Sequence, residues 1–228
     1  TANNSKQPLE MNKVTAICKQ EVGREYETVF ELHRLNTWIK KLSNSQQFAF
    51  DTETTSLNYM EARVVGVSVS TVLGEAAYIP FGHDYDGAPD QISLSDAEEI
   101  LGHVIVANEK KLVGQNLKFD LPVLRRHGFR VTDFLADTML LSYVFNSTGS
   151  RHGLDYLAKN YLDYEPIKFD EVVGTGKKRI SFSQVDLDIA TEYAAEDADI
   201  TLRLFKYFSD QLAKEKSLNT LLETIEKP

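Results

Sequence analysis

Short apolar runs separated by turn residues fill the first half of the chain and predict strands. Three of them, Phe48–Glu53, Arg63–Thr71 and Ala76–Pro80, follow one another closely, which predicts an antiparallel meander. Shorter runs at Tyr26–Phe30 and Lys111–Gly114 predict two further strands. Together these segments indicate one sheet.

Apolar residues at helical spacing cover much of the remaining chain. The segment Glu31–Leu42 is expected to be helical, and Ser93 with Asp96 forms the S-x-x-D pattern of a helix start. The apolar stripe of the first helix consists of Leu32, Leu35, Trp38, Ile39 and Leu42. Further helices are expected around Leu117–His127, Asp137–Phe145, Gly153–Tyr161 and Asp188–Lys214.

Strands first and helices afterwards predict an α/β domain, with helices packed on a sheet. Residues 26–228 are expected to form this domain. Residues 1–25 lack sustained periodicity, and we interpret them as a linker or lead segment. Residues 165–183 are rich in charged and turn residues, which predicts an exposed excursion between two helices.

Composition narrows the class of protein. The chain has 228 residues, of which 42% are hydrophobic, as suits one globular domain with a tail. Its net charge of −9 (25 basic and 34 acidic residues) argues against extensive non-specific binding of duplex DNA. Cys18 is the one cysteine, so no intrachain disulfide is expected, as suits a reducing cytoplasm. No apolar run is long enough to predict a membrane span.

Acidic residues in three separate segments are the candidate catalytic and metal-binding residues. Asp51 and Glu53 end an apolar strand and, two positions apart, point to the same face. Tyr193 and Asp197, four apart, share one face of a helix, and Asp120 lies in a third segment. Taken alone, the first pair could be a solvated strand end. Converging carboxylates repel one another unless cations neutralise them, so the set predicts phosphodiester hydrolysis at two divalent metal ions.

Three motifs in this order carry a family resemblance: FDTETTSL, NLKFD and YAAED. They resemble the DEDD exonucleases, in the subclass whose last motif is Y-x-x-x-D. The segments PFGHDYDGAPDQI, VGQNLKFDLPVL and SRHGLDYLA are similar to the proofreading 3′–5′ exonuclease domain of bacterial DNA polymerase I, a family A polymerase. The resemblance runs from about Tyr26 to the C-terminus. It implies the ribonuclease H-like fold, a mixed β-sheet flanked by α-helices.

The resemblance also implies roles for the acids. Asp51 would bridge two divalent metal ions, Glu53 and Asp197 would complete one site, and Asp120 would hold the second ion. Mg²⁺ is the expected cofactor, with Mn²⁺ or Zn²⁺ as alternatives. We assign Tyr193 to orienting the attacking water, because a free tyrosine with a pKa of about 10 is a poor base at neutral pH.

Substrate contacts follow from the same resemblance. Leu57 and Phe169 resemble apolar wedges that stack on or separate terminal bases, although core packing of Leu57 is an equally open alternative. Gln115, Asn116 and Arg151 resemble contacts to the sugar and phosphate of a strand end.

The basic run Lys177–Arg179 follows Gly174 and Gly176 and superficially resembles a phosphate loop. A Walker A motif would require Gly at position 171 and Ser or Thr at position 178, where the chain has Glu171 and Lys178. We interpret this run as a basic loop near the DNA end.

The expected activity is that of a metal-dependent 3′→5′ exonuclease that removes 5′-mononucleotides from DNA. The expected partners are a single-stranded or frayed DNA 3′ end and, in the full-length protein, a covalently linked polymerase domain. No membrane partner is expected, and we expect a monomer that acts in the bacterial cytoplasm at the nucleoid.

Two alternatives stay open. One is an RNA 3′-trimming exonuclease of the RNase D kind, against which the segments GHDYDGAPDQ and SRHGLDYLAKNYL count. The other is a non-catalytic domain that binds 3′ ends, against which the complete set of acids and the tyrosine counts.

Overall fold

A six-stranded mixed sheet lies at the centre of the computed structural model, which describes residues 14, 16–19, 23–149, 151–222 and 224. The strand order is β1-β4-β3-β2-β5-β6. The strands are β1 (Glu25–Thr28), β2 (Phe48–Thr54), β3 (Val64–Val72), β4 (Glu75–Pro80), β5 (Leu112–Gly114) and β6 (Ala136–Asp137). The predicted meander is confirmed, because β2–β3 and β3–β4 pair antiparallel, whereas β1, β5 and β6 pair in parallel with their neighbours.

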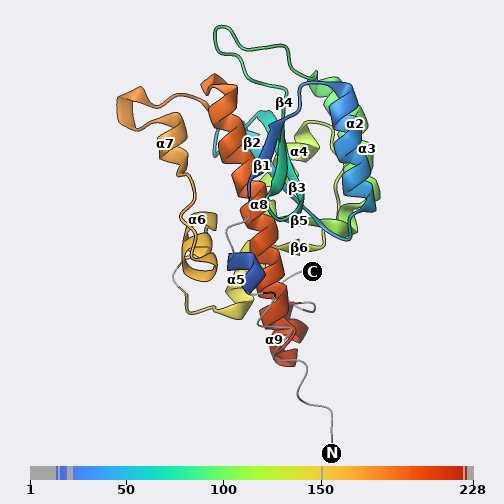
Figure 1. Cartoon of the computed structure of the whole chain (residues 1–228), viewed down its shortest axis with the longest axis vertical. Coiled ribbons are helices and arrows are strands. Elements are labelled where there is room, and N and C mark those ends of the chain that lie inside the picture. Colours follow the sequence, from blue (N-terminus) through green and yellow to red (C-terminus); the bar gives the residue numbers. More distant parts are fainter. Residues whose placement is uncertain (1–13, 15, 20–22, 150, 223, 225–228) are drawn as a thin grey trace, which may run out of the picture.

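Helices cover both faces of this sheet (Figure 1). One face carries α2, α3 and α4, and the long helix α8 crosses the other, where it contacts β1 to β4. The α-helices with defined bounds among the described residues are α2 (Leu32–Asn44), α3 (Leu94–Ala107), α4 (Leu117–Arg126), α5 (Thr138–Phe145), α6 (Leu154–Leu157), α7 (Phe169–Val173), α8 (Leu187–Leu212) and α9 (Lys216–Leu221). A sheet covered on both faces is buried on both, which explains why the first seven residues of β3 are all buried.

The main apolar core fills the space between the sheet and the helices α2, α3 and α4. Leu35 and Trp38 of α2 pack there against Phe48 and Phe50 of β2, and all four side chains are 0–1% exposed. Leu32 is 45% exposed, so the predicted stripe was wrong at this first position of the helix. The predicted cap of α3 is confirmed, because the Ser93 side chain accepts a hydrogen bond from the Asp96 N–H.

Small side chains bring α8 close to the sheet. Ala190, Ala194 and Ala198 are fully buried, and Ala198 packs against Ala49 of β2. Without larger side chains between them, the helix backbone and the strand can approach closely. This approach places the acidic residues of α8 beside those of β2.

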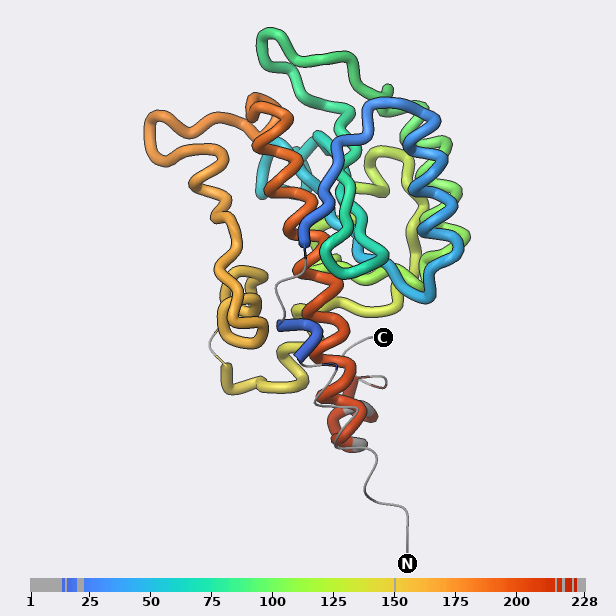
Figure 2. Tube along the Cα trace, viewed as in Figure 1, coloured from blue at the N-terminus to red at the C-terminus, as the bar shows by residue number. Residues whose placement is uncertain are grey.

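The excursion predicted at residues 165–183 extends in the structure over residues 164–186, which run from below α7 up along the N-terminal half of α8 (Figure 2). Val173 and Phe182 are 1% exposed and pack with α8 and the sheet, so the prediction of an exposed segment was wrong for these side chains. Val185, just beyond the predicted range, is also buried in this cluster. Not every apolar residue of the segment packs inward, because Ile180 is 44% exposed. The basic residues Lys177 and Lys178 are exposed, as predicted.

The predicted lead segment falls mostly outside the described residues, which omit 1–13, 15 and 20–22. Residues 16–19 are helical, and Cys18 is 1% exposed in an apolar cluster with residues of α5 and α8. The two-residue strand β6 was not predicted, because its length gives no alternating pattern. None of the helices among the described residues combines the length and apolar character needed to cross a membrane.

Candidate active site

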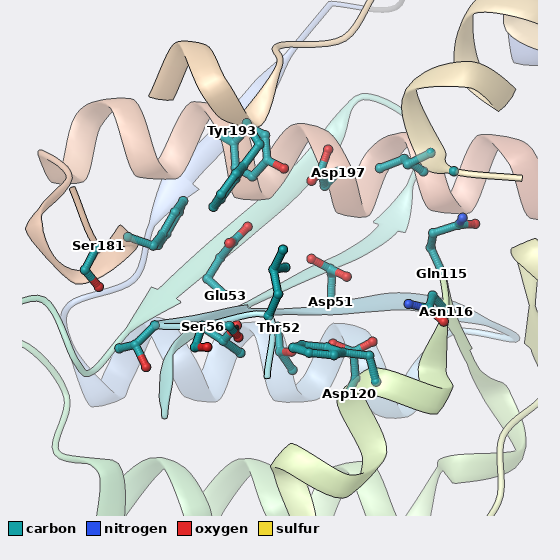
Figure 3. Close-up of a pocket in the computed structure, with 18 of the residues that line it drawn as sticks. Asp51, Thr52, Glu53, Ser56, Gln115, Asn116, Asp120, Ser181, Tyr193 and Asp197 are labelled. Carbon is teal, nitrogen blue, oxygen red and sulfur yellow. Dashed lines mark hydrogen bonds between the residues drawn. The ribbon is translucent and has the colours of Figure 1, made fainter. Parts of the chain in front are cut away.

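Three carboxylates converge beside the middle of the sheet. Asp51 and Glu53 come from β2 and Asp197 from α8, and one ligand oxygen of each lies within 4.8 Å of the other two. Figure 3 shows these side chains gathered in the space between the strand and the helix. The two-residue spacing on the strand and the small side chains of α8 together bring them there.

A fourth carboxylate, Asp120, lines the same cavity from α4 and is 4% exposed. Its Oδ1 accepts a hydrogen bond from the hydroxyl of Thr52, the residue between Asp51 and Glu53. Thr52 therefore ties the fourth acid to the strand that carries the first two. Sequence reasoning did not identify this contact, because Thr52 and Asp120 are 68 positions apart.

The turn before α4 aims that helix at the cavity. Asn116 has φ 64°, in the left-handed region that side chains other than glycine seldom adopt. The Asp137 carboxylate holds the turn, because it accepts hydrogen bonds from the N–H groups of Asn116 (3.0 Å) and Leu117 (2.8 Å). A strained residue that is held in place next to a carboxylate cluster is a common feature of functional sites.

Burial, and after it repulsion by neighbouring carboxylates, raises the pKa of all four carboxyl groups. Burial, followed by the charge of Asp197, raises the pKa of Asp51 to about 8. Burial likewise raises the pKa values of Glu53, Asp120 and Asp197 well above the usual range. The buried Oε1 of Glu53 finds no hydrogen-bond partner among the described residues. An all-oxygen set with an orphaned carboxylate oxygen fits a hard divalent cation.

Tyr193 lies half-buried at the cavity, one turn before Asp197 on α8. Burial, then the charges of Asp197 and Glu53, raise the pKa of its hydroxyl far above the ordinary tyrosine value. Hydrogen bonding from the Tyr193 hydroxyl lowers the pKa of Asp197 against the larger effect of burial. The phenol therefore stays protonated at neutral pH, where it can donate a hydrogen bond but cannot act as a base.

Aromatic rings form a wall beside Tyr193. Phe169 stacks on Phe182 with ring centroids 6.2 Å apart and an interplanar angle of 6°. Tyr193 lies tilted against both, at 5.8 Å and 6.0 Å. Phe169 is half-buried, which corrects the expectation that it would stand on an exposed segment. We call Phe169, Phe182 and Tyr193 the aromatic wall.

Glu196 anchors the beginning of the excursion. This residue precedes Asp197 on α8 and is 1% exposed. Its carboxylate accepts hydrogen bonds from the Tyr164 hydroxyl and from the N–H of Ile167 (2.7 Å). The helix that carries a metal-ligand candidate thus also fixes the chain that leads to the aromatic wall.

The segment GHDYDGAPDQ anchors the other end of the excursion. The His83 ring donates from Nδ1 to the Val185 carbonyl (3.0 Å) and accepts at Nε2 from the Tyr78 hydroxyl (2.9 Å), as its neighbours require. The N–H of Asp84 donates to the Ser183 carbonyl (2.9 Å). In the sequence this segment contributed only to a resemblance; the structure shows that it supports the wall of the cavity.

The four acids, Tyr193, Leu57, Gln115, Asn116 and Phe169 all line one cavity of about 660 Å³. Leu57 is 80% exposed, which excludes the core-packing alternative. Gln115 and Asn116 lie at the end opposite Ser181 (Figure 3). Arg151 is exposed and is not among the lining residues.

Several lining residues were missed by the sequence reasoning. They include Thr52, Arg179 and Phe182. The basic run Lys177–Arg179 was a usable signal, but its spacing could not show which of its side chains faces the cavity.

A mixed sheet in this order, with helices on both faces and four acids from three elements lining one cavity beside it, is the ribonuclease H-like fold. The sequence profile of the 3′–5′ exonuclease family matches residues 26–213. The chain belongs to this family.

Curated relatives agree with this assignment. DNA polymerase I of Pseudomonas aeruginosa is 40% identical over 206 residues, which cover 90% of this chain and 23% of the relative. DNA polymerase I of Rhizobium leguminosarum is 38% identical, with 89% and 22% covered. The chain thus spans less than a quarter of the length of these relatives.

Solved structures share the fold. The POL domain of Pol1 from M. smegmatis, in complex with DNA primer-template and dNTP, matches 87% of this chain and 30% of that chain (TM-score 0.64, 18% identity). The Nibbler EXO domain of Aedes aegypti matches 90% and 99% (TM-score 0.62, 14% identity). Brucella melitensis NrnC with bound Mg²⁺ matches 89% of each chain (TM-score 0.58, 21% identity). At these identities the likeness establishes the fold alone.

Proposed function

We propose that this chain is the exonuclease unit of a DNA polymerase I and removes 5′-mononucleotides from DNA 3′ ends during proofreading. The observation that carries the proposal is the convergence of the Asp51, Glu53 and Asp197 oxygens within 4.8 Å, with Asp120 in the same cavity. The names of the two bacterial relatives support the DNA substrate.

We propose that the cavity holds two divalent cations and that both are Mg²⁺; the cluster of three carboxylate oxygens with Asp120 nearby supports this. Asp51, Glu53 and Asp197 would hold one ion, and Asp51 with Asp120 would hold the second. When bound, such ions polarise a phosphate oxygen and lower the pKa of water, which supplies a nucleophile at neutral pH. Mn²⁺ takes similar oxygen ligands and is the first substitute to test.

Side chains of the protein position the reactants. Tyr193 keeps its proton and can orient the attacking water toward the phosphorus, while Thr52 holds Asp120 in place. Gln115 and Asn116 offer amide donors to the sugar and phosphate of the strand end. Leu57 and Phe169 present apolar surface to the terminal bases.

The proposed substrate is an unpaired strand end. The ligand oxygens lie inside a cavity between β2 and α8, so a paired terminus must first fray before its last phosphate can reach them. Because the chain carries a net charge of −9, it offers little attraction to a duplex. We propose that a covalently linked polymerase domain supplies duplex binding in the full-length protein, which we place in the bacterial cytoplasm as a monomer.

Digestion of 5′-labelled DNA tests the proposal. Single-stranded, blunt and 3′-mismatched substrates are compared on sequencing gels, with Mg²⁺ and with EDTA. We expect a ladder that shortens from the 3′ end, fastest for the single strand, next for the mismatch and slowest for the blunt duplex. EDTA should abolish it.

Two results would contradict the proposal. One is cleavage that begins at internal positions or proceeds equally on all three substrates. The other is faster removal of a 3′-terminal ribonucleotide from an RNA strand than of a deoxynucleotide from the matched DNA strand, which would favour RNA trimming.

A further inference from the structure

One cationic side chain lines the cavity that the acids line. Among the residues that line it, four are carboxylates and Arg179 is the single lysine or arginine. Arg179, Ile180 and Ser181 are consecutive lining residues, and Figure 3 shows Ser181 at one end of the site, away from Gln115 and Asn116. The cation therefore belongs to the end of the cavity that the excursion forms.

Backbone hydrogen bonds fix the loop that presents Arg179. Gly174 has φ 77°, a conformation that favours glycine, and turns the chain at the end of α7. The N–H of Ile180 donates to the Val173 carbonyl (2.9 Å), and the N–H of Arg179 donates to the Gly176 carbonyl (3.3 Å). These bonds close a small loop whose last residues face the cavity.

The Arg179 side chain is held by contacts that a ligand could replace. Its guanidinium lies 5.4 Å from the centroid of the Phe169 ring. Its Nη1 lies 3.3 Å from Oδ1 of Asp170, in an ion pair whose two side chains are 46% and 60% exposed. An exposed ion pair contributes little to stability, so exchange of this carboxylate for another anion is easy. The ring keeps the guanidinium over the cavity wall.

We propose that Arg179 binds a backbone phosphate of the single strand, on the 5′ side of the phosphate that is cleaved. The inference rests on the proposed function. The four carboxylates and their cations would receive the cleaved phosphate, whereas a phosphate further along the strand would otherwise meet a cavity of negative charge. A guanidinium suits this task, because its planar donors bind two phosphate oxygens at once. Arg179 is thus a substrate-binding residue that holds the strand against the aromatic wall.

Lys178 offers a matched control. It carries the same charge one position earlier in the loop, but it is exposed and does not line the cavity. Removing either side chain changes the net charge equally. Only Arg179 is expected to contact the strand, so a difference between the two variants reports a specific contact rather than the general field of the protein.

Steady-state kinetics on a single-stranded oligodeoxynucleotide test the inference. Arg179→Ala should raise KM about ten-fold with kcat unchanged, and it should reduce the slope of log(kcat/KM) against log[salt] by about 0.7, the value for one phosphate contact on a single strand. Arg179→Lys should recover part of the loss. Lys178→Ala should change KM less than two-fold and leave the slope unchanged.

A small substrate separates strand binding from chemistry. The p-nitrophenyl ester of thymidine 5′-monophosphate has no second phosphate, so Arg179→Ala should hydrolyse it at the wild-type rate. Equal losses in Arg179→Ala and Lys178→Ala would overturn the inference. An Arg179→Ala defect on this ester as large as that on the strand would also overturn it. A higher KM with an unchanged salt slope would do the same, because both results indicate that Arg179 acts only by packing against Phe169.

A binding measurement keeps the inference distinct from the proposed function. Fluorescence anisotropy of a labelled single strand is measured in the Asp51→Ala background, where cleavage is removed. Arg179→Ala should weaken binding about ten-fold there and Lys178→Ala less than two-fold. Unequal binding with no hydrolysis by the wild type would contradict the proposed function and support the phosphate contact. Equal binding by the Arg179→Ala and Lys178→Ala variants, with normal hydrolysis by the wild type, would contradict the phosphate contact and support the proposed function.

Discussion

The cavity has two walls, and they are built differently. The acidic wall consists of β2 and α8, regular elements packed in the core, which carry Asp51, Glu53 and Asp197. The opposite wall is the excursion, whose longest regular element is the five-residue α7. The excursion keeps its place through apolar side chains and through hydrogen bonds to Glu196 and the His83 segment.

The difference matches the work that each wall does. Metal-ligand geometry tolerates deviations of only a few tenths of an ångström, which regular elements in a packed core can hold. Recognition of a flexible strand tolerates more variation, and loops on a fixed scaffold commonly perform it. Mutations in the acidic wall should therefore affect the chemical step, and mutations in the excursion should affect how the strand binds.

The largest effect is expected from the acidic wall. Asp51→Ala should reduce nuclease activity about a thousand-fold or more, because Asp51 is proposed to contact both ions. The protein should stay folded, since the change relieves repulsion among buried carboxylates. Activity and thermal unfolding are measured together. Glu192→Ala, which removes an exposed acid from the same helix, is the control and should retain full activity. Mg²⁺-dependent cleavage retained by Asp51→Ala would refute the assignment.

A smaller loss is expected at the junction of the two walls. Tyr193→Phe should lower kcat on the order of ten- to a thousand-fold, because it removes the hydroxyl that orients the water. The pH–rate profile should keep its shape, since the Tyr193 pKa lies far above neutral. Loss of the alkaline limb in this variant would instead make the tyrosine the base.

Breaking an anchor of the excursion should weaken binding of the strand more than it slows the chemical step, the opposite of what is expected for the acidic wall. Glu196→Ala leaves the Tyr164 hydroxyl and the Ile167 N–H without their acceptor, which should lower the free energy of unfolding by about 2 kcal/mol. KM for single-stranded DNA should rise more than kcat falls. Chemical denaturation and kinetics on the strand and on the p-nitrophenyl ester check this. A variant that loses activity equally on both substrates would show that the excursion affects the chemical step as much as it affects strand binding.

Metal-free stability should fall as the pH rises. The folded protein holds a proton on Asp51 up to its pKa of about 8, whereas the unfolded chain releases it near the ordinary value of 3.8. The unfolded state therefore binds fewer protons between these values, and stability decreases across that window. Melting temperatures in EDTA from pH 4 to pH 9 should decline, and Asp51→Asn should flatten the decline. A melting temperature that instead rises with pH would contradict the assigned carboxyl environment.

The smallest effect is expected from the aromatic wall. Phe169→Ala should increase the ratio of single-strand to blunt-duplex digestion several-fold, because the ring no longer helps keep terminal bases apart. The rate at saturating single-stranded DNA should change little. Leu57→Ala, at an 80% exposed position, should act in the same direction. An unchanged ratio in both variants would remove the proposed role of these side chains in fraying.

Much of the fold followed from local patterns. The apolar runs of β2, β3 and β4, the cap at Ser93 and the long apolar stripe of α8 are decided by residues close together in the sequence. The burial of apolar side chains in the excursion, and the strand β6, were missed for the opposite reason. Phe182 lies in a polar stretch and is buried by contacts with Tyr78 and with α8, more than a hundred positions away in the first case. No local pattern encodes that burial.

Some features of the candidate site likewise follow from local sequence patterns, and others depend on contacts between distant segments. The sequence by itself determined which acids can meet, because D-x-E on a strand and Y-x-x-x-D on a helix each fix a shared face. Only the tertiary structure decided what surrounds them. It placed Thr52 against Asp120 and brought Arg179 to the cavity but not Arg151. Periodicity sets the direction of a side chain relative to its own element. Contacts between distant elements depend on how those elements pack, which requires the whole fold.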